Sequence, residues 1–389
     1  MIFQVAYRNF LGQGMRAILN VSVTALIIIA TIFSLSLLNG FQAQSLKNLS
    51  ITDVGGGHYR VPGFDILSPT DWEDLTRKIP ETLSQFAHEQ KAEVLVQQGQ
   101  LFINNRLFPV QLRGLEMEQK LLDLPMAKLQ EWSKPVEDIV PIIIGKQMSR
   151  KSKLNVGDQV VMKWRDKHGA VDALDTEVVD VIPLVNPRVD KGVAWLRLDH
   201  LRQITQRDKE ITWVVVDEQK GNVEGLEFID VDYLMRDLLA LLKNDRRNTR
   251  LIIGILLMLA AISVFNAQYL NIFKRQKEIG TLMAMGMTPK QVIRLFTLEG
   301  SLAAIGAVFM AVILGVPFFI WFQATGFDVS HLSETGIPVR ENIFLKFNVR
   351  EIVSTISVIV FLMVIVAWWP VRRLSKLEPT LALRGRGIT

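Results

Sequence analysis

Four stretches of this chain contain no charged residue and are each long enough to cross a membrane. They cover residues 17–46, 251–273, 301–327 and 352–371. A helix needs about 20 apolar residues to cross the hydrocarbon core, and a helix satisfies its own backbone hydrogen bonds where lipid offers none. The sequence therefore predicts a membrane α-helical protein with four transmembrane helices in contact with lipid, the first and second extended as a stalk.

Between the first two apolar stretches lies a long segment of ordinary soluble composition, residues 47–248. Runs rich in β-branched and apolar residues predict strands in it, and the pattern becomes helical from Val231 towards the second span, so we expect a mixed α/β domain. A short helix is expected between Ser68 and Pro80. Gly55-Gly56-Gly57 is interpreted as a flexible junction at the end of the stalk. The predicted strands are Ala92–Gln98, Leu101–Arg113 (folded into a hairpin at Asn104-Asn105), Val140–Ile144, Gln159–Trp164, Thr176–Ile182 and Thr212–Val216.

Lysine and arginine are unevenly distributed among the connecting segments. Residues 1–16 hold two, residues 274–299 five and residues 372–389 five, whereas residues 328–350 hold three together with acidic residues. The positive-inside rule places the first three segments in the cytoplasm and residues 47–248 outside. The predicted order is a cytoplasmic interfacial helix (1–16), the first span and stalk (17–46), the extracytoplasmic domain (47–248), the second span (249–273), a cytoplasmic coupling helix and elbow (274–299), the third span (300–327), a short outer loop (328–350), the fourth span (351–371) and a cytoplasmic tail (372–389).

The segment between the second and third apolar stretches carries a dense set of helix stop and start signals. Gly286 can end one helix in the left-handed conformation. Thr288, Pro289 and Gln291 then provide a cap, a first-turn proline and the third residue of a capping box, with Met287 and Val292 placed as a hydrophobic staple. We predict a rigid docking element built on a short basic helix from Lys274 to Met285. The alternative is a solvated loop between two spans.

The third apolar stretch has small residues at every fourth position: Ala303, Ala307, Ala311 and Gly315. Small residues at this spacing allow two helices to approach closely. The pattern is equally consistent with packing inside one chain and with dimerisation.

The sequence lacks the motifs of several common kinds of catalytic and nucleotide-binding site. The chain has no GxxxxGK[ST] phosphate loop, no GxSxG, no HExxH and no cysteine, and its five histidines (58, 88, 168, 200 and 331) lie far apart in sequence. The net charge of +5 is not gathered into a basic, aromatic-interleaved face, so nucleic-acid binding is not expected. No ionisable residue lies within the apolar stretches, which argues against an ion path or proton relay. Spans that transmit movement fit this pattern, and so do simple anchors for the outer domain.

The elbow sequence resembles the signature of FtsX-like, or MacB-like, ABC transporter permeases, the mechanotransmission (type VII) class. The resemblance rests on Arg275-Gln276-Lys277-Glu278-Ile279-Gly280, on Ala284-Met285-Gly286-Met287-Thr288 and on Glu299-Gly300. The tail from Pro370 through Leu377-Glu378-Pro379-Thr380-Leu381-Ala382-Leu383-Arg384 is similar to the closing motif of that family. Ile144-Gly145 and Leu154-Asn155-Val156-Gly157-Asp158 resemble its outer-domain signature. Within the family, Met287-Thr288-Pro289 and Gly57-His58 are most like the lipoprotein-releasing, or Lol-type, permeases.

The resemblance implies a permease subunit without its own nucleotide-binding domain, which pairs with a second permease (identical or different) and with a dimer of ABC ATPase subunits. ATP and Mg²⁺ would bind to the ATPase, and this chain would hold no cofactor or metal of its own. Its implied location is the bacterial inner membrane, with several spans and the large domain in the periplasm. The ATPase contacts implied are the polar Lys274, Arg275, Lys277 and Glu278 and the apolar Ile279, Leu282, Met283 and Met285, with Gly280 and Gly286 between them.

The resemblance leaves the cargo and the role open. The implied substrate is a lipoprotein or another amphiphile, extracted or exported with a periplasmic chaperone or adaptor as a further partner. One alternative is a signalling scaffold that activates a cell-wall hydrolase through its outer domain, as in cell-division members of the family. Another is an efflux permease that works with a periplasmic adaptor.

Overall fold

The computed structural model describes residues 2–65, 68, 71–132, 139–182, 187–328 and 342–374. The chain divides into two compact units. The helical unit comprises Met1–Phe41, Lys243–Phe327 and Ile343–Thr389, and the α/β unit comprises Gln42–Leu242 and Asp328–Asn342. The predicted tail motif beyond Leu374 and most of the predicted outer loop lie outside the described residues.

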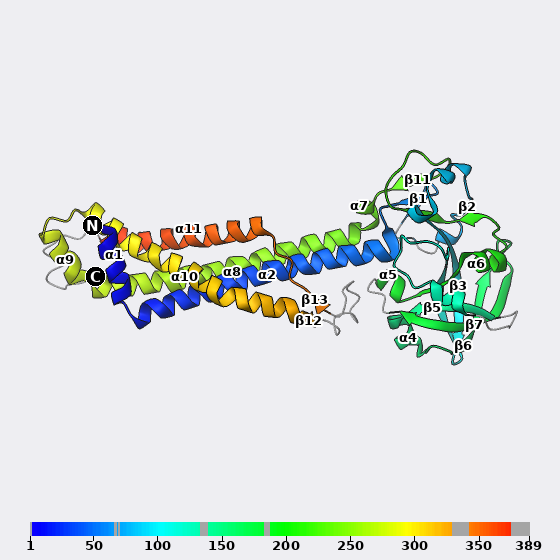
Figure 1. Cartoon of the computed structure of the whole chain (residues 1–389), viewed down its shortest axis with the longest axis horizontal. Helices are drawn as coiled ribbons and strands as arrows, with labels where there is room; N and C mark the ends of the chain where they lie inside the picture. Colours follow the sequence, from blue (N-terminus) through cyan, green and yellow to red (C-terminus); the bar gives the residue numbers. More distant parts are fainter. Residues whose placement is uncertain are drawn as a thin grey trace. The chain divides into compact units, whose positions relative to one another are not determined.

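Among the described residues, six helices make up or enter the helical unit (Figure 1). They are α1 (Ile2–Gly12), α2 (Met15–Leu49), α8 (Arg236–Lys274), α9 (Gln276–Ala284), α10 (Pro289–Thr325) and α11 (Val349–Leu374). Four helical segments among the described residues are long and apolar enough to cross a membrane: Ala17–Val54, Arg236–Lys274, Pro289–Thr325 and Val349–Arg372. The predicted fold class, four membrane helices with a mixed α/β domain, is confirmed.

The sequence predicted a helix start at Thr288-Pro289 and a third span over residues 300–327. In the structure, α10 is one helix from Pro289 to Thr325. No proline lies between Pro289 and Pro317, and Gly300 is closely packed within the helix. A Cβ added to Gly300 would lie 2.5 Å from the Cβ of Ala367 on α11. The first turn of α10 is therefore continuous with the part of this helix that is predicted to cross the membrane.

The α/β unit is built on a nine-stranded mixed sheet with the order β11-β1-β10-β3-β4-β8-β5-β7-β6. Strand β6 also pairs with β3, which closes β3, β4, β8, β5, β7 and β6 into a ring. The pairs β4–β8 and β5–β7 are parallel, and the other pairings in this sheet are antiparallel. The nine strands are β1 (His58–Arg60), β3 (Lys91–Ile103), β4 (Arg106–Leu115), β5 (Ile139–Gly145), β6 (Gln159–Arg165), β7 (Val171–Ile182), β8 (Val193–Arg197), β10 (Trp213–Val216) and β11 (Glu227–Ile229).

The remaining strands and helices are short. Two further strand pairs are β2 (Arg77–Lys78) with β9 (Glu210–Ile211) and β12 (Phe327–Asp328) with β13 (Asn342–Ile343). The short helices are η1 (Ser50–Val54), η2 (Asp71–Glu73), η3 (Glu81–Gln85), η4 (His88–Gln90), α3 (Ala127–Glu131), α4 (Lys146–Ser152), α5 (Pro187–Asp190), α6 (Leu198–Thr205) and α7 (Val231–Leu234).

The sheet is buried on both faces, as strand β5 shows. Its Ile143 belongs to a cluster with Trp195 and Trp213, whereas its neighbours Ile142 and Ile144 belong to a second cluster. Successive side chains on a strand point to opposite faces, so an uninterrupted apolar run indicates a strand covered on both sides.

Three local predictions differ from the structure. The helix expected from Ser68 to Pro80 is only the single turn η2, and residues after it enter β2 instead. The strand break expected near Gly99 is absent, because Gly99 pairs with Val110 on one side and Trp164 on the other. Gly55-Gly56-Gly57 is not a flexible junction: Gly56 N–H donates to the Val216 carbonyl at 2.8 Å. A Cβ on Gly56 would lie 1.6 Å from the carbonyl oxygen of Asp217, so the triplet is required by close packing.

Candidate functional site

The helix α9, at one end of the helical unit beside α1, is the element that the sequence singled out (Figure 1). It is shorter than expected. Lys274 is the last residue of α8, and Arg275 leaves the helical conformation with φ −103° and ψ 18°. At the other end, Gly286 has φ +98°, which reverses the chain after Ala284 and Met285. The expected helix from Lys274 to Met285 is thus corrected to Gln276–Ala284, because Arg275 is drawn out of it by the contacts described below.

The start of α10 has the geometry that its sequence implies. Thr288 and Gln291 form a capping box around Pro289, and the Thr288 N–H donates to Gln291 Oε1 at 2.8 Å. Val292 is buried, and Met287 packs against the same apolar cluster. The cap and the staple fix the angle at which the chain turns from α9 into α10.

The two faces of α9 have different environments. Ile279 and Gly280 are buried, and Leu282 and Met283 pack partly into a cluster with residues of α1, α8, α10 and α11. Three of the four apolar residues expected to contact an ATPase therefore hold α9 against its own chain. The exposed face is formed by Lys274, Lys277, Glu278, Thr281 and Met285. We call these five residues the outer face of α9.

Arg275 connects this helix to the interior of the helical unit. Its Nε donates to Glu278 Oε2 at 2.6 Å, and its Nη1 lies 3.2 Å from both carboxylate oxygens of Glu299. Its guanidinium also lies 5.2 Å from the ring centroid of Phe296 on α10. Only 19% of the Arg275 side chain is exposed, and its described contacts lie within the chain. Its predicted contact with an ATPase stays a prediction.

Glu299 is the buried end of this connection. Its side chain has no exposed surface, although it lies inside α10 among apolar residues. Besides Arg275, the side-chain amide of Gln13, in the turn between α1 and α2, donates to it. A buried carboxylate is tolerated only when it is paired and hydrogen-bonded. Glu299 therefore joins α10, the α8–α9 junction and the α1–α2 turn, and we call Glu278, Arg275, Glu299 and Gln13 the elbow network.

Sequence reasoning used Glu299 only as part of a motif and did not identify this network. The available signal was a single acid in an otherwise apolar helical stretch, which requires a buried cation. The identity of that cation, and the role of Gln13, depend on contacts between residues 24 and 286 positions apart.

The small residues of α10 lie within the chain rather than on a free face. Ala307 and Ala311 are buried with Val21, Ala25 and Ile28 of α2. A Cβ on Gly315 would lie 3.2 Å from Ile29, also on α2. Ala303 lies at the edge of this contact and is half-buried. Among the described residues, no group of three or more His, Cys, Asp or Glu side chains is placed to hold a metal ion.

Comparison with known proteins gives three findings. Residues 250–379 match the FtsX-like permease C-terminal family. The chain is 21% identical over 418 residues to the lipoprotein-releasing system transmembrane protein LolC of Neisseria meningitidis, with 97% of this chain and 95% of the relative covered. It is 20% identical over 310 residues to the protein of the same name from Xylella fastidiosa, with 71% and 73% covered.

A third relative matches over a shorter region. The macrolide export ATP-binding/permease protein MacB of Rhodopirellula baltica is 23% identical over 133 residues, which are 34% of this chain and 17% of that protein. The match is thus to a limited part of a longer protein, whereas the first relative matches almost from end to end.

Proposed function

This chain is an ABC transporter permease of the FtsX-like and MacB-like class, and from that membership we propose that it converts the movement of a separate ABC ATPase into movement of its α/β unit. The chain itself would be non-catalytic, and the ATP and Mg²⁺ would be held by the partner. The observation that supports this most directly is the elbow network: an exposed residue on α9 is connected through Arg275 to a buried carboxylate inside a membrane helix.

The outer face of α9 is the surface proposed to contact the ATPase. It presents Lys274, Lys277 and Glu278 as charged groups, and Met285 with 72% of its surface exposed. Its opposite face is anchored by buried Ile279. A helix held in this way moves together with the helices behind it instead of flexing against them.

The transmission route follows from the elbow network. A displacement of α9 moves Arg275, which is bound to Glu299 in α10, and Glu299 accepts a hydrogen bond from Gln13 in the turn before α2. Helices α2 and α8 are unbroken over 35 and 39 residues. Long helices are stiff on this length scale, so we propose that they carry the displacement to Gln42 and Leu242, where the chain enters and leaves the α/β unit.

The same proposal assigns sides of the membrane. The positive-inside rule places α9 in the cytoplasm, where an ATPase would find it, and the α/β unit in the periplasm. The inner membrane would hold the chain beside a second permease subunit, either a copy of itself or a related chain.

We propose a lipoprotein or similar amphiphile as the substrate. Two relatives carry the name lipoprotein-releasing system transmembrane protein, and one of them matches 97% of this chain. An apolar cavity of about 420 Å³ between α2, α10 and α11 also fits an acyl chain. Its walls include Ile28, Val308, Phe319 and Ile356.

The test of ATPase coupling is co-purification from native membranes. An affinity-tagged chain should bring down an ABC ATPase, identified by mass spectrometry, and the complex should hydrolyse ATP. Lys277→Glu, on the outer face of α9, should reduce both the ATPase recovered and its turnover. Lys151→Glu, an equal charge change on exposed α4, is the matched control. A wild-type chain that retains no ATPase in mild detergent contradicts the proposal.

The test of substrate uses the same complex in proteoliposomes containing a lipid-anchored lipoprotein. Addition of ATP should move the lipoprotein into the soluble fraction in the presence of a periplasmic carrier, and Lys277→Glu should slow this release. Co-purification of a cell-wall hydrolase without lipoprotein release would favour the signalling scaffold. An anchored adaptor with ATP-driven transport of a small amphiphile would favour the efflux permease.

A further inference from the structure

Four cations lie along one face of α8, directly before the part of this helix that is predicted to cross the membrane. They are Lys243, Arg246, Arg247 and Arg250, and all four are exposed. Residues three, four and seven positions apart share a face of an α-helix, so these side chains form one row. Arg246 already interacts with another group of the chain. We therefore define the basic stripe of α8 as the other three: Lys243, Arg247 and Arg250.

The described residues around the basic stripe do not compensate its charge. Helix α2 runs beside this part of α8, where Gln42 Nε2 donates to the Leu242 carbonyl at 3.2 Å, and α2 contains no aspartate or glutamate in its 35 residues. Asp245 lies on the other side of α8, about 200° round the helix from each of its two nearest stripe residues. Among the described residues, none forms an ion pair with the stripe.

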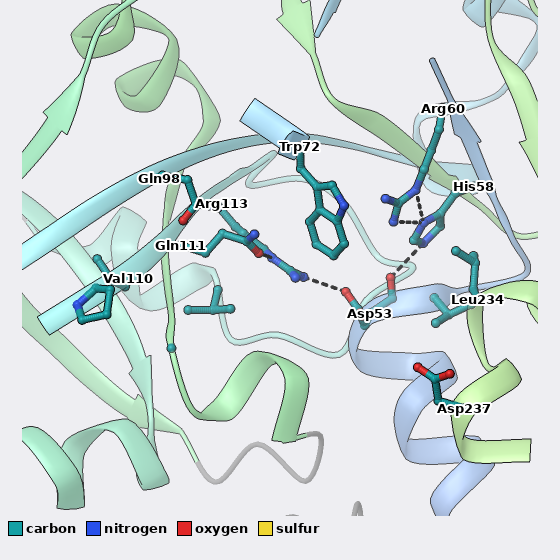
Figure 2. A pocket seen from close by; sticks show the side chains of 14 residues that line it. Asp53, His58, Arg60, Trp72, Gln98, Val110, Gln111, Arg113, Leu234 and Asp237 are labelled. Atoms are coloured by element: carbon teal, nitrogen blue, oxygen red, sulfur yellow. Dashed lines mark hydrogen bonds and ion pairs between the residues drawn. The ribbon is translucent and has the colours of Figure 1, made fainter. Parts of the chain in front are cut away.

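Buried cations elsewhere in this chain have partners within it (Figure 2). In the α/β unit, Arg113 Nη1 donates to the Asp53 carboxylate at 2.6 Å. The buried Arg60 guanidinium lies 3.9 Å from the ring centroid of Trp213, and that of Arg113 lies 5.4 Å from those of Trp195 and Trp213. A cation is buried only with such compensation. The basic stripe is exposed and has no comparable partner among the described residues, so its charges are available to a ligand outside the chain.

The basic stripe lies at the depth of a lipid headgroup layer. The uncharged stretch of α8 begins at Leu251, immediately after Arg250. A helix rises about 1.5 Å per residue, so Lys243 lies about 10 Å beyond Arg250 along the helix axis. The headgroup layer is about 5–8 Å thick on each side of the hydrocarbon core, and long cationic side chains extend along a helix to reach it. All three charges can therefore contact lipid phosphates.

An open apolar surface continues from the basic stripe into the uncharged part of α8. One turn after Arg250, Gly254 is exposed, and a Cβ added there would have no neighbour within 4 Å. Leu251, Ile255 and Met258 lie beside it on the same side of the helix, with 64%, 56% and 59% of their surfaces exposed. An acyl chain can lie along this surface while the phosphate of the same lipid contacts the stripe.

We propose that the basic stripe and the apolar surface next to it bind an anionic phospholipid. A cation close to a membrane surface strengthens the binding of anionic lipid by about fivefold, so three together give a preference of up to roughly a hundredfold over a zwitterionic lipid. The proposed topology places this lipid in the outer leaflet. Topology setting does not explain the stripe there, because the positive-inside rule favours cations on the opposite side. This binding does not depend on the proposed ATPase coupling.

The experiment is native mass spectrometry of the full chain released from maltoside micelles. Before the measurement, the chain is incubated with equal amounts of phosphatidylglycerol and phosphatidylcholine that carry identical acyl chains. We expect the wild-type chain to retain phosphatidylglycerol at least tenfold more than phosphatidylcholine. Equal retention of the two lipids overturns the proposal, and this comparison requires no variant.

Variants then locate the binding on α8. The triple variant Lys243→Gln, Arg247→Gln and Arg250→Gln should lower the preference for phosphatidylglycerol at least tenfold. Its melting temperature should match that of the wild type, because the three side chains are exposed. Arg250→Gln alone should lower the preference by about threefold to fivefold, and it replaces the triple variant if that variant folds poorly.

A matched control removes the same three charges from exposed positions of the α/β unit. It combines Arg106→Gln, Lys151→Gln and Arg165→Gln and should keep the wild-type preference. An equal loss of preference in the two triple variants would show a general effect of net charge and overturn the proposal. It is also overturned if the stripe variant keeps its lipid preference but loses a protein partner or a second copy of the chain on size-exclusion chromatography.

Discussion

Arg275, at the junction of α8 and α9, lies with Nη1 3.2 Å from both carboxylate oxygens of Glu299, a residue of α10 whose side chain is completely buried. This ion pair is the main polar connection between the exposed helix α9 and the interior of the helical unit among the residues that the structure describes. A buried pair contributes little net stability compared with apolar residues of the same size, but breaking it leaves one charge uncompensated. The ion pair therefore fixes the position of α9 more than it raises the stability of the fold.

The first prediction concerns this pair. Arg275→Met should destabilise the chain by about 3–5 kcal/mol, because Glu299 would remain buried without its cation. The double variant Arg275→Met with Glu299→Gln should recover most of that loss, since no buried charge is left. Thermal unfolding in detergent, followed by size-exclusion chromatography, measures both effects. A double variant as unstable as the single one would show that the pair acts through packing alone.

The same variants also test the proposed coupling between ATP hydrolysis and substrate release. If the elbow network transmits movement, the double variant should fold but should hydrolyse ATP without releasing substrate efficiently. Ser357→Ala, at an exposed position of α11 outside the elbow network, is the control because its hydroxyl donates to the Val353 carbonyl of the same helix. Normal release by the folded double variant would exclude the network from the transmission route.

The second prediction concerns the cap of α10. Thr288→Ala removes half of the capping box and should destabilise the first turn of α10 by about 0.5–2 kcal/mol. The loss is local, so hydrogen exchange of the amides at residues 291 and 292 should become up to roughly tenfold faster while the middle of the helix is unchanged. Unaltered exchange at these amides would show that Met287 and Val292 alone hold the turn.

The third prediction concerns the contact between α10 and α11. Gly300→Val should prevent the two helices from reaching their observed separation, because even a single Cβ would lie 2.5 Å from that of Ala367. We expect little folded protein in the membrane fraction, or a drop of several degrees in melting temperature. Gly254→Ala is the matched control, since an added Cβ there has no neighbour within 4 Å. A wild-type melting temperature for Gly300→Val would contradict the helix packing described here.

Local chemistry explains which parts of this structure could be predicted from the sequence. Gly286, Thr288, Pro289 and Gln291 act within a few residues of one another, so their pattern specified the elbow correctly. Strands β3, β4, β5, β6, β7 and β10 were recognisable as apolar runs, whereas β1, β8 and β11 were not predicted, and neither was the order of the strands. Closure of the ring depends on the pairing of β3 with β6, for example Gly99 with Trp164, and no local signal specifies that partner.

The features that were predicted wrongly or not at all depend on contacts between residues far apart in the sequence. Gly55-Gly56-Gly57 has the composition of a flexible linker, and only its contact with the distant Asp217 shows that glycine is needed for close approach. Ile279, Leu282 and Met283 are suited to a partner interface or to a core, and residue type does not distinguish the two, so their contact with an ATPase stays a prediction. The burial of Arg60 and Arg113 was not foreseen either, because it depends on tryptophans brought together by three separate segments of the sheet and its edge.

The last prediction concerns an acidic pair in the α/β unit. Burial, together with the negative charge of Glu93, raises the pKa of Glu116 to about 7. Lys91 lies 3.2 Å and Arg202 3.0 Å from the Glu93 carboxylate, so the two cations compensate Glu93 and leave Glu116 to bind a proton. Because the pKa in the folded chain exceeds the ordinary value of 4.5, the folded state binds more protons than the unfolded state between about pH 4.5 and pH 7. The free energy of unfolding should therefore fall as the pH rises through this window.

Glu116→Gln isolates this contribution from the other titrating groups. Glutamine keeps a donor for Glu93 but carries no charge, so the variant should be more stable than wild type at pH 8 by on the order of 1 kcal/mol, a value reduced by partial solvent exposure of the site. The two proteins should converge near pH 5, where Glu116 is protonated in the folded state. Thermal unfolding of the full chain from pH 5 to pH 8 measures the difference, with Glu118→Gln, an exposed neighbour, as the control. A difference that is constant with pH, or largest at pH 5, would show that Glu116 is ionised in the folded protein throughout this range.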